Sequence, residues 1–402
     1  MQGVRAEAGY IPAIEGLRGI AVLWVILFHY VVVRDARFDD PWIAAIAAVK
    51  PLNVIVRNGY LGVDLFFLIS GFLLTLPWFM RAARGAPPPS TREFYARRFW
   101  RIAPAYYVQL LVLFGIVLPL LKGITYWRSD LYVIAANVVA HVGFVHNTTP
   151  LTSSSLNING ALWTLAVEAQ YYALVPLAAL AFLRAPVVAV IGAFATAVAW
   201  QLGAKHGLEG LVAFERWLGT PWGWSEAIVR QLLLTQLPSY LGHFALGILA
   251  GRAWLRWREQ PLAPGKRRAL LAATVAALAL LYVVYGHLGP IAGDVTWLVV
   301  PLSFGLAFFA LAASDRAVAH PLLGRGPLAF LGRVSYSAYL YHLLVLMLWN
   351  AFMPPLGWLS MPLYIGGVVA IAWISWRYVE RRFVRSYRDR YPTASAAAMA
   401  RV

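Results

Sequence analysis

Residues 13–33 read AIEGLRGIAVLWVILFHYVVV, a run that is apolar or aromatic apart from Glu15, Arg18 and His29. A helix needs about 20 mainly apolar residues to cross the hydrocarbon core of a bilayer, so this run is long enough to span one. Charged residues stand near its start, and no small-x-small site precedes Arg34, so the run lacks the pattern of a cleaved signal peptide. It therefore predicts a membrane-spanning helix that stays in the protein.

The composition of the whole chain indicates that the rest of the protein also lies in a membrane. Of the 402 residues, 61% are hydrophobic and 13% are charged, and the mean hydropathy is +0.66. A soluble domain is roughly 45–50% apolar and about 25% charged, so the chain is not a soluble domain. We expect an all-α integral membrane protein that forms one domain over residues 1–402. Its candidate spans are 13–33, 59–80, 102–121, 131–147, 161–183, 186–202, 232–254, 269–288, 294–313, 332–351 and 359–379.

The distribution of Arg and Lys predicts the topology, because basic loops stay on the cytoplasmic side of a membrane. Six Arg lie in 81–101, six Arg or Lys lie in 252–268, and seven Arg lie in 377–402. We expect all three basic blocks in the cytoplasm, the last of them as a basic tail over 381–402. The net charge of +17 is then a topology signal, so no nucleic-acid partner is expected.

An even number of spans must separate two cytoplasmic regions. Three candidates lie between the first basic block and Arg184, whose turn is also expected in the cytoplasm. Segment 131–147 is the shortest of the three and carries Asn137, His141 and His146, so we assign it to a re-entrant or surface helix. About ten transmembrane helices remain, in one bundle with both termini cytoplasmic.

Several chemistries are excluded by what the sequence lacks. There is no cysteine, which excludes disulfides, thiolate nucleophiles and cysteine-ligated metals. No G-x-S-x-G elbow and no P-loop motif is present. His141 and His146 are five residues apart, a poor spacing for two ligands of one metal on a helix, so no metal site is expected.

Ionisable side chains within membrane spans are costly, so each one is a candidate functional residue. Counted from the external ends of their helices, His29, Asp64 and Glu168 fall in one layer in the outer half of the membrane. A carboxylate beside an imidazole can hold its tautomer and raise its basicity. The other ionisable residues within the predicted spans are Arg18, His243 and His342.

Arg18 and His29 share one face of their predicted helix. They are eleven residues apart, which is about three turns and about 16 Å along the axis. This face carries an anion-binding cation near the cytoplasm and a candidate base deeper in the membrane, an arrangement that suits a long donor with phosphates at one end. Acyl-CoA has this shape, with a thioester at the tip of its pantetheine arm. One turn apart at the start of another helix, Arg97, Arg98 and Arg101 also suit phosphates.

A structural interpretation stands beside each of these residues. A single His in a span often serves as an interhelical hydrogen-bond partner, which applies to His243 and His342. Arg18 can extend its side chain to the membrane interface. Asp64 and Glu168 can belong to structural ion pairs, and the arginine block near them can serve topology alone.

Six motifs follow one another along the chain. They are IEGLRGIA (14–21) with FH (28–29), GVDLFFLISGFL (62–73), YARRFWRIAP (95–104), LWTLAVEAQYY (162–172), SYSAYLYH (335–342) and YVERRF (378–383). In this order they resemble the acyltransferase-3 family of integral membrane acyltransferases, whose hallmark is an Arg and a His separated by ten residues. The resemblance runs from residue 11 to residue 383 and so covers essentially the whole chain.

The resemblance implies a ten-helix bundle that transfers an acyl group from cytoplasmic acyl-CoA to an acceptor hydroxyl, on a cell-envelope sugar or a macrolide-type product. It implies that His29 is the catalytic residue, with Glu168 and Asp64 in support. It implies that the donor is bound by Arg18, Arg98 and Arg101. Further candidate site residues in the matching motifs are Arg97, Ser70, Ser335 and His342.

Two departures from the family pattern affect these expectations. The chain ends shortly after Glu380 without the SGNH esterase-like domain that is fused to many relatives. We therefore expect acceptor specificity to lie in the bundle, in the loops 34–58 and 203–231, or in a separate partner. Ala169 follows Glu168 where relatives commonly carry a second acid.

The sequence predicts an acyl-CoA-dependent O-acyltransferase of a bacterial plasma membrane, most simply an O-acetyltransferase that modifies a carbohydrate or a glycosylated small molecule. Acyl-CoA is expected as a substrate, with no permanently bound cofactor. In one mechanism, neutral His29 takes the proton of the acceptor hydroxyl, and Glu168 or Asp64 stabilises the imidazolium. In another, the acyl group passes through an acyl-histidine. The alternative from another class is a proton-coupled transporter or flippase of an envelope precursor, which predicts inverted repeats that the sequence does not show.

Overall fold

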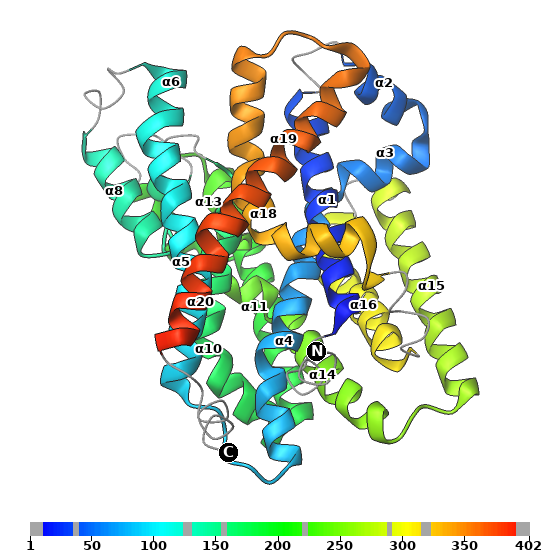
Figure 1. The fold of residues 1–402 in the computed structure, drawn as a ribbon. Helices are drawn as coiled ribbons and strands as arrows, with labels where there is room; N and C mark the ends of the chain where they lie inside the picture. Colours follow the sequence, from blue (N-terminus) through cyan, green and yellow to red (C-terminus); the bar gives the residue numbers. More distant parts are fainter. Residues whose placement is uncertain are drawn as a thin grey trace.

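The computed structural model describes residues 11–34, 40–123, 131–153, 159–218, 224–287, 292–314 and 323–390, and the chain is helical in these ranges, without a strand. Figure 1 shows long helices that lie side by side as a bundle. The predicted all-α membrane fold is therefore confirmed. The end of the predicted basic tail (391–402) and parts of the loops 34–58 and 203–231 lie outside the described residues.

Over the ranges that the structure describes, the bundle is built from ten long helices and several short ones. The long helices are α1 (Pro12–Arg34), α4 (Gly62–Ala83), α5 (Thr91–Val112), α10 (Trp163–Arg184), α11 (Pro186–His206), α14 (Leu241–Glu259), α15 (Pro264–His287), α16 (Ala292–Ala313), α18 (Gly326–Phe352) and α19 (Ser360–Ser375). The shorter ones are α2 (Pro41–Ala48), α3 (Lys50–Arg57), α6 (Leu118–Lys122), α8 (Leu131–Val142), α9 (Pro150–Ser153), α12 (Glu209–Leu218), α13 (Glu226–Leu234) and α20 (Arg381–Arg390). A π-helical turn extends α5 (Leu113–Val117), and another links α19 to α20 (Trp376–Glu380).

The helices agree closely with the predicted spans. Within the described residues, eight helical stretches are long and apolar enough to cross a membrane, and α13 with α14, bent by 46°, forms a ninth. The tenth predicted span, 332–351, forms α18, whose 27 residues measure about 40 Å. α18 falls outside the apolar set because it buries polar side chains such as Ser337 and His342 against other helices.

Segment 131–147 does not form a spanning helix. Its helix, α8, covers 12 residues. At 1.5 Å per residue this is about 18 Å, short of the roughly 30 Å hydrocarbon core. The assignment of this segment to a re-entrant or surface helix therefore agrees with the structure.

Glycines bring α1 and α18 into backbone contact. A Cβ atom on Gly332 would lie 1.8 Å from the backbone oxygen of Glu15, and one on Gly19 would lie 2.1 Å from that of Leu328. Because such contacts are far inside van der Waals distance, both positions require glycine. The two helices are therefore held at one register, which sets which of their side chains meet.

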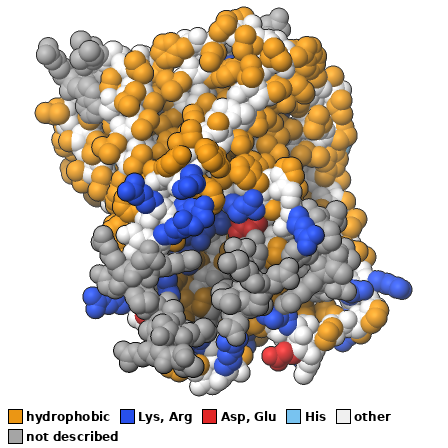
Figure 2. All heavy atoms as spheres, in the orientation of Figure 1, with side chains coloured by type: hydrophobic (Ala, Val, Ile, Leu, Met, Phe, Trp, Pro, Cys, Tyr) orange, Lys and Arg blue, Asp and Glu red, His pale blue; other side chains and the backbone are white. Residues whose placement is uncertain are grey.

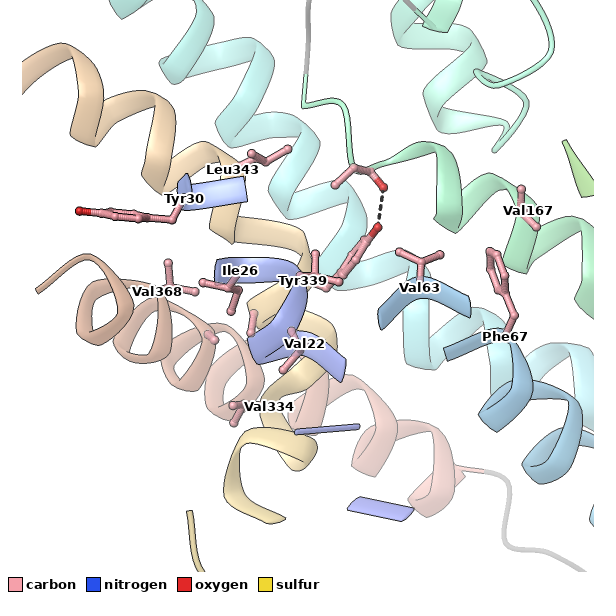
Figure 3. Packing of buried hydrophobic residues seen from close by; sticks show 14 of the residues in the cluster. Val22, Ile26, Tyr30, Val63, Phe67, Val167, Val334, Tyr339, Leu343 and Val368 are labelled. Carbon is pink, nitrogen blue, oxygen red and sulfur yellow. Dashed lines mark hydrogen bonds between the residues drawn. The ribbon is translucent and has the colours of Figure 1, made fainter. Parts of the chain in front are cut away.

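The core around these helices is apolar and tightly packed. Figure 3 shows side chains from α1, α4, α10, α18 and α19 pointing toward one another. Burial of this surface holds the helices that carry the candidate site residues in place. The labelled members of the cluster are Val22, Ile26, Tyr30, Val63, Phe67, Val167, Val334, Tyr339, Leu343 and Val368.

The predicted basic blocks gather at one end of the bundle. The α4–α5 connection, the α14–α15 connection and α20 all lie in the lower part of Figure 1. In the same orientation, Figure 2 shows hydrophobic side chains over the upper part of the molecule and Lys and Arg side chains in its lower half. This grouping is the one that the topology prediction requires, and the assignment of this end to the cytoplasm remains our prediction.

Candidate active site

A pocket opens between α1, α4, α5, α10 and α18. Its lining brings together residues that lie up to 321 positions apart in the chain, from Arg18 to Tyr339. Apolar side chains from α4 and α5 complete the walls. The polar and charged lining residues are Arg18, Ser70, Arg98, Arg101, Thr164, Glu168, Tyr172, Ser335, Tyr336 and Tyr339.

The charges of this lining favour an anionic ligand. Three arginines, Arg18, Arg98 and Arg101, face one carboxylate, that of Glu168. Nε of Arg98 and Oγ of Ser335 are buried and find no hydrogen-bond partner among the described residues. A buried donor without a partner is costly, so the pocket is built to give hydrogen bonds to a ligand that is not part of the chain.

The N-terminal cap of α5 positions two of the arginines. The side chain of Ser90 accepts a hydrogen bond from the backbone N–H of Glu93, which begins the helix. Arg98 and Arg101 then lie one turn apart on the face of α5 that lines the pocket, and the guanidinium of Arg98 also lies over the ring of Phe94, 5.7 Å from its centroid.

Arg97 does not line the pocket. Its side chain is 38% exposed and pairs with Glu93, one turn earlier on α5, at 3.6 Å. The structure therefore separates the three arginines that the sequence grouped together. Arg98 and Arg101 enter the site, while Arg97 lies on the outer face of the same helix.

Glu168 is held by two hydroxyl groups. Its Oε1 accepts hydrogen bonds from Oγ of Ser70 at 2.9 Å and from the hydroxyl of Tyr172 at 2.7 Å. The two hydroxyl groups hold this oxygen from two helices, α4 and α10. Tyr172 follows Glu168 by one helical turn, a spacing that is visible in the sequence and predicts this contact.

His29 lies outside the lining of this pocket and pairs with another histidine. Its Nδ1 is 3.3 Å from Nε2 of His342 and 2.9 Å from the backbone oxygen of Val25, and the two ring centroids are 4.9 Å apart. Nδ1 of His342 lies 2.7 Å from the backbone oxygen of Tyr339. α1 and α18 thus bring two of the predicted site residues together.

Tyr339 stands between the pocket and the histidine pair. Its side chain lines the pocket, and its hydroxyl donates to the backbone oxygen of Ala161 at 3.0 Å (Figure 3). Its ring centroid is 5.5 Å from that of His342, and its backbone oxygen bonds the same histidine. The cationic pocket and the imidazoles are therefore neighbouring parts of one region.

Asp64 pairs with a histidine on a different helix. Its Oδ1 lies 2.9 Å from Nε2 of His243, and both side chains are buried between α4 and α14. The structure does not show the predicted contact of Asp64 or Glu168 with His29, because each carboxylate lies against other side chains. His29, Asp64 and Glu168 lie at a similar predicted depth in the membrane. The rotation of each helix about its axis directs the three side chains to different partners. The sequence predicts His243 as an interhelical hydrogen-bond partner, but it does not identify Asp64 as the group that His243 contacts.

The two histidines of segment 131–147 lie together but away from the pocket. The rings of His141 and His146 stack in parallel with centroids 4.0 Å apart, and Nδ1 of His141 is 2.7 Å from the backbone oxygen of Asn137. Burial lowers the pKa of His141 to about 3 and that of His146 to about 4, so both rings are neutral at physiological pH.

Comparisons with known proteins identify the family to which the chain is similar. The acyltransferase-3 family model, described as an acyltransferase domain, matches residues 11–377. The peptidoglycan O-acetyltransferase OatA of Listeria monocytogenes is 27% identical over 188 residues, which are 45% of this chain and 26% of OatA. The exopolysaccharide production protein ExoZ of Rhizobium meliloti is 29% identical over 286 residues, which are 71% of this chain and 75% of ExoZ. The chain thus spans about a quarter of OatA. A search of the solved structures found no match.

Proposed function

Because the chain belongs to the acyltransferase-3 family, we propose that it is a membrane O-acyltransferase that transfers an acyl group, most simply acetyl, from acyl-CoA to a hydroxyl of a carbohydrate or glycosylated acceptor. We place it in a bacterial plasma membrane, as a multi-pass protein. The names of two relatives support the carbohydrate, since one acts on peptidoglycan and the other serves exopolysaccharide production.

The cationic pocket is the observation that carries this proposal. Arg18, Arg98 and Arg101 line it, and Nε of Arg98 is a buried donor without a partner among the described residues. Guanidinium groups bind phosphate oxygens through short, charge-assisted hydrogen bonds. The phosphates of acyl-CoA are the part of the donor that these three side chains would hold.

The helix that carries Arg18 also carries the proposed catalytic residue. His29 follows Arg18 on α1 by about 16 Å, which leaves room for the pantetheine arm between the phosphates and the thioester. The acceptor oxygen attacks the thioester carbon, so a C–O bond forms and the C–S bond breaks. His29 takes the proton of the attacking hydroxyl and returns it to the departing CoA thiolate. In the double-displacement route, the imidazole itself first receives the acyl group.

Glu168 belongs to the donor pocket in this proposal. Its contacts with Ser70 and Tyr172 place a fixed negative charge among the three arginines. Such a charge keeps the arginine side chains directed into the pocket before the donor binds. Glu168 therefore supports donor binding, and His29 obtains its hydrogen bonds from other groups.

Transfer by the purified protein tests the proposal. Protein in lipid nanodiscs is given acetyl-CoA labelled in the acetyl group, together with a panel of glycan acceptors, and CoA release and labelled ester are measured. We expect both in the parent protein and neither in His29→Ala. A proton-coupled transporter would move a precursor across a vesicle membrane without consuming acetyl-CoA, and that result would replace the enzyme proposal.

A further inference from the structure

We propose that His342 is a positioning residue for His29, and that it directs Nε2 of His29 toward the reacting groups. The inference rests on the proposed catalytic role of His29. It starts from the contact between the two imidazoles, whose nitrogens lie 3.3 Å apart across α1 and α18. His342 is fully buried, and the close backbone contact of the two helices at Gly332 holds this pair in register.

Two backbone carbonyls decide where the protons of the pair lie. A carbonyl oxygen can only accept, so Nδ1 of His342, at 2.7 Å from the oxygen of Tyr339, carries a proton. A neutral imidazole has one N–H, so Nε2 of His342 is an acceptor. Nδ1 of His29 faces this acceptor and the oxygen of Val25, so it is the donor to both.

The opposite arrangement of protons fails at two places. With Nε2 of His342 as the donor, Nδ1 of His342 would turn a lone pair toward the oxygen of Tyr339 at 2.7 Å. Nδ1 of His29 would likewise turn a lone pair toward the oxygen of Val25 at 2.9 Å. Two repulsive contacts of this kind, the one at His342 buried and the one at His29 partly buried, oppose that arrangement.

The proton arrangement leaves Nε2 of His29 free to react. Nδ1–H is occupied by Val25 and His342, so Nε2 carries the lone pair that takes the hydroxyl proton or attacks the thioester. When Nε2 gains a proton, the positive charge spreads to Nδ1, whose hydrogen bond to His342 then strengthens. A neutral acceptor thus does what a carboxylate does in a catalytic triad, and it does so while Asp64 and Glu168 lie against other side chains.

A pair of substitutions at His342 tests this role. His342→Phe keeps a ring of similar size and removes the acceptor. His342→Gln places a side-chain oxygen close to the position of Nε2 and restores an acceptor. The matched control is His141→Phe, because His141 is also a buried histidine whose Nδ1 bonds a helix carbonyl, and it lies outside the site. We measure kcat and the KM for acetyl-CoA in nanodiscs.

We expect His342→Phe to lower kcat about 10- to 100-fold with the KM for acetyl-CoA within about twofold of the parent, which is the range found when a supporting hydrogen-bond partner is removed. His342→Gln should recover most of the loss, and His141→Phe should stay within about twofold of the parent. Equal losses in the Phe and Gln variants, or full kcat in His342→Phe, would overturn the inference.

A second measurement is independent of activity. Protein labelled with ¹⁵N-histidine in nanodiscs, with the His29 signals assigned by their loss in His29→Gln, should show Nδ1 protonated and Nε2 unprotonated. A protonated Nε2 in neutral His29 would refute the inference, even if His342→Phe failed to fold. If His29→Ala retained transfer activity, the proposed function of His29 would fail instead, so the two failures remain distinguishable.

Discussion

Oδ1 of Asp64 lies 2.9 Å from Nε2 of His243, and this contact joins α4 to α14 in the interior of the bundle. The pair engages the carboxylate of Asp64 with α14. On α4, Asp64 therefore links the helix to α14. Ser70, further along the same helix, donates a hydrogen bond to Glu168 in the pocket. The two roles lead to different predictions.

Removing either member of the Asp64–His243 pair should destabilise the protein more than it alters donor binding. Loss of one partner of a buried pair costs on the order of 3 kcal/mol, because the other is left without compensation. We expect Asp64→Leu and His243→Leu each to lower the thermal unfolding midpoint in detergent. The double variant should lose less than the two single losses combined, and strictly additive losses would show that the contact contributes nothing.

The arginines of α5 should differ in their effect on donor binding. Arg98→Ala and Arg101→Ala each remove a charge-assisted phosphate contact of about 1.5–3 kcal/mol, or roughly tenfold to a hundredfold in the Kd for acetyl-CoA. Arg97→Ala is the matched control on the same helix, because its side chain pairs with Glu93 outside the pocket. Calorimetric titration with acetyl-CoA measures the Kd of all three variants. An unchanged Kd in both pocket variants would show that Arg98 and Arg101 serve only as topology signals.

His29→Ala should abolish transfer and leave acetyl-CoA binding close to that of the parent. Removing a general base costs about 10²–10⁴-fold in rate, while Arg18, Arg98 and Arg101 still hold the phosphates. His29→Gln should be equally inactive, since an amide cannot shuttle the proton. Substantial activity in His29→Gln would make His29 an orienting residue and move the base elsewhere.

Alanine should be tolerated very differently at two glycines. At Gly332, the new Cβ would lie 1.8 Å from the backbone oxygen of Glu15, so α1 must move away from α18. We expect Gly332→Ala to lose stability by 1 kcal/mol or more, on the order of overpacked cores, and to lose transfer activity. Gly366→Ala, with no atom within 4 Å, should instead gain roughly 0.5–1 kcal/mol. Thermal unfolding compares the two, and equal behaviour would contradict the close contact.

Cysteine labelling should place the basic end of the bundle in the cytoplasm. The native chain has no cysteine, so a single introduced cysteine gives a signal without background. Arg92→Cys, in the first turns of α5, should be labelled by a membrane-impermeant reagent only after the cells are opened. Labelling in intact cells would reverse the predicted topology.

Much of the site followed from residue spacing along single helices. Arg98 and Arg101 share a face of α5 because they are about one turn apart, and Tyr172 contacts Glu168 for the same reason. The spacing of Arg97 from its neighbours did not reveal that it turns outward. One turn of α5 carries side chains in several directions, and only the packing of α5 against α10, α18 and α20 selects which of them face the pocket.

The amino-acid sequence by itself determined the membrane-spanning helices, the separation of basic blocks from apolar runs, and the common helix of Arg18 and His29. These properties depend on hydrophobicity and on helix geometry within one segment. Only the tertiary structure decided that His29 meets His342, that Asp64 meets His243, and that Glu168 joins the three arginines. The physical reason is that depth in a membrane is set by residue position, whereas the partner of a side chain depends on how each helix is rotated about its axis. That rotation is set by packing, at contacts such as Gly332 against Glu15, between residues far apart in the chain.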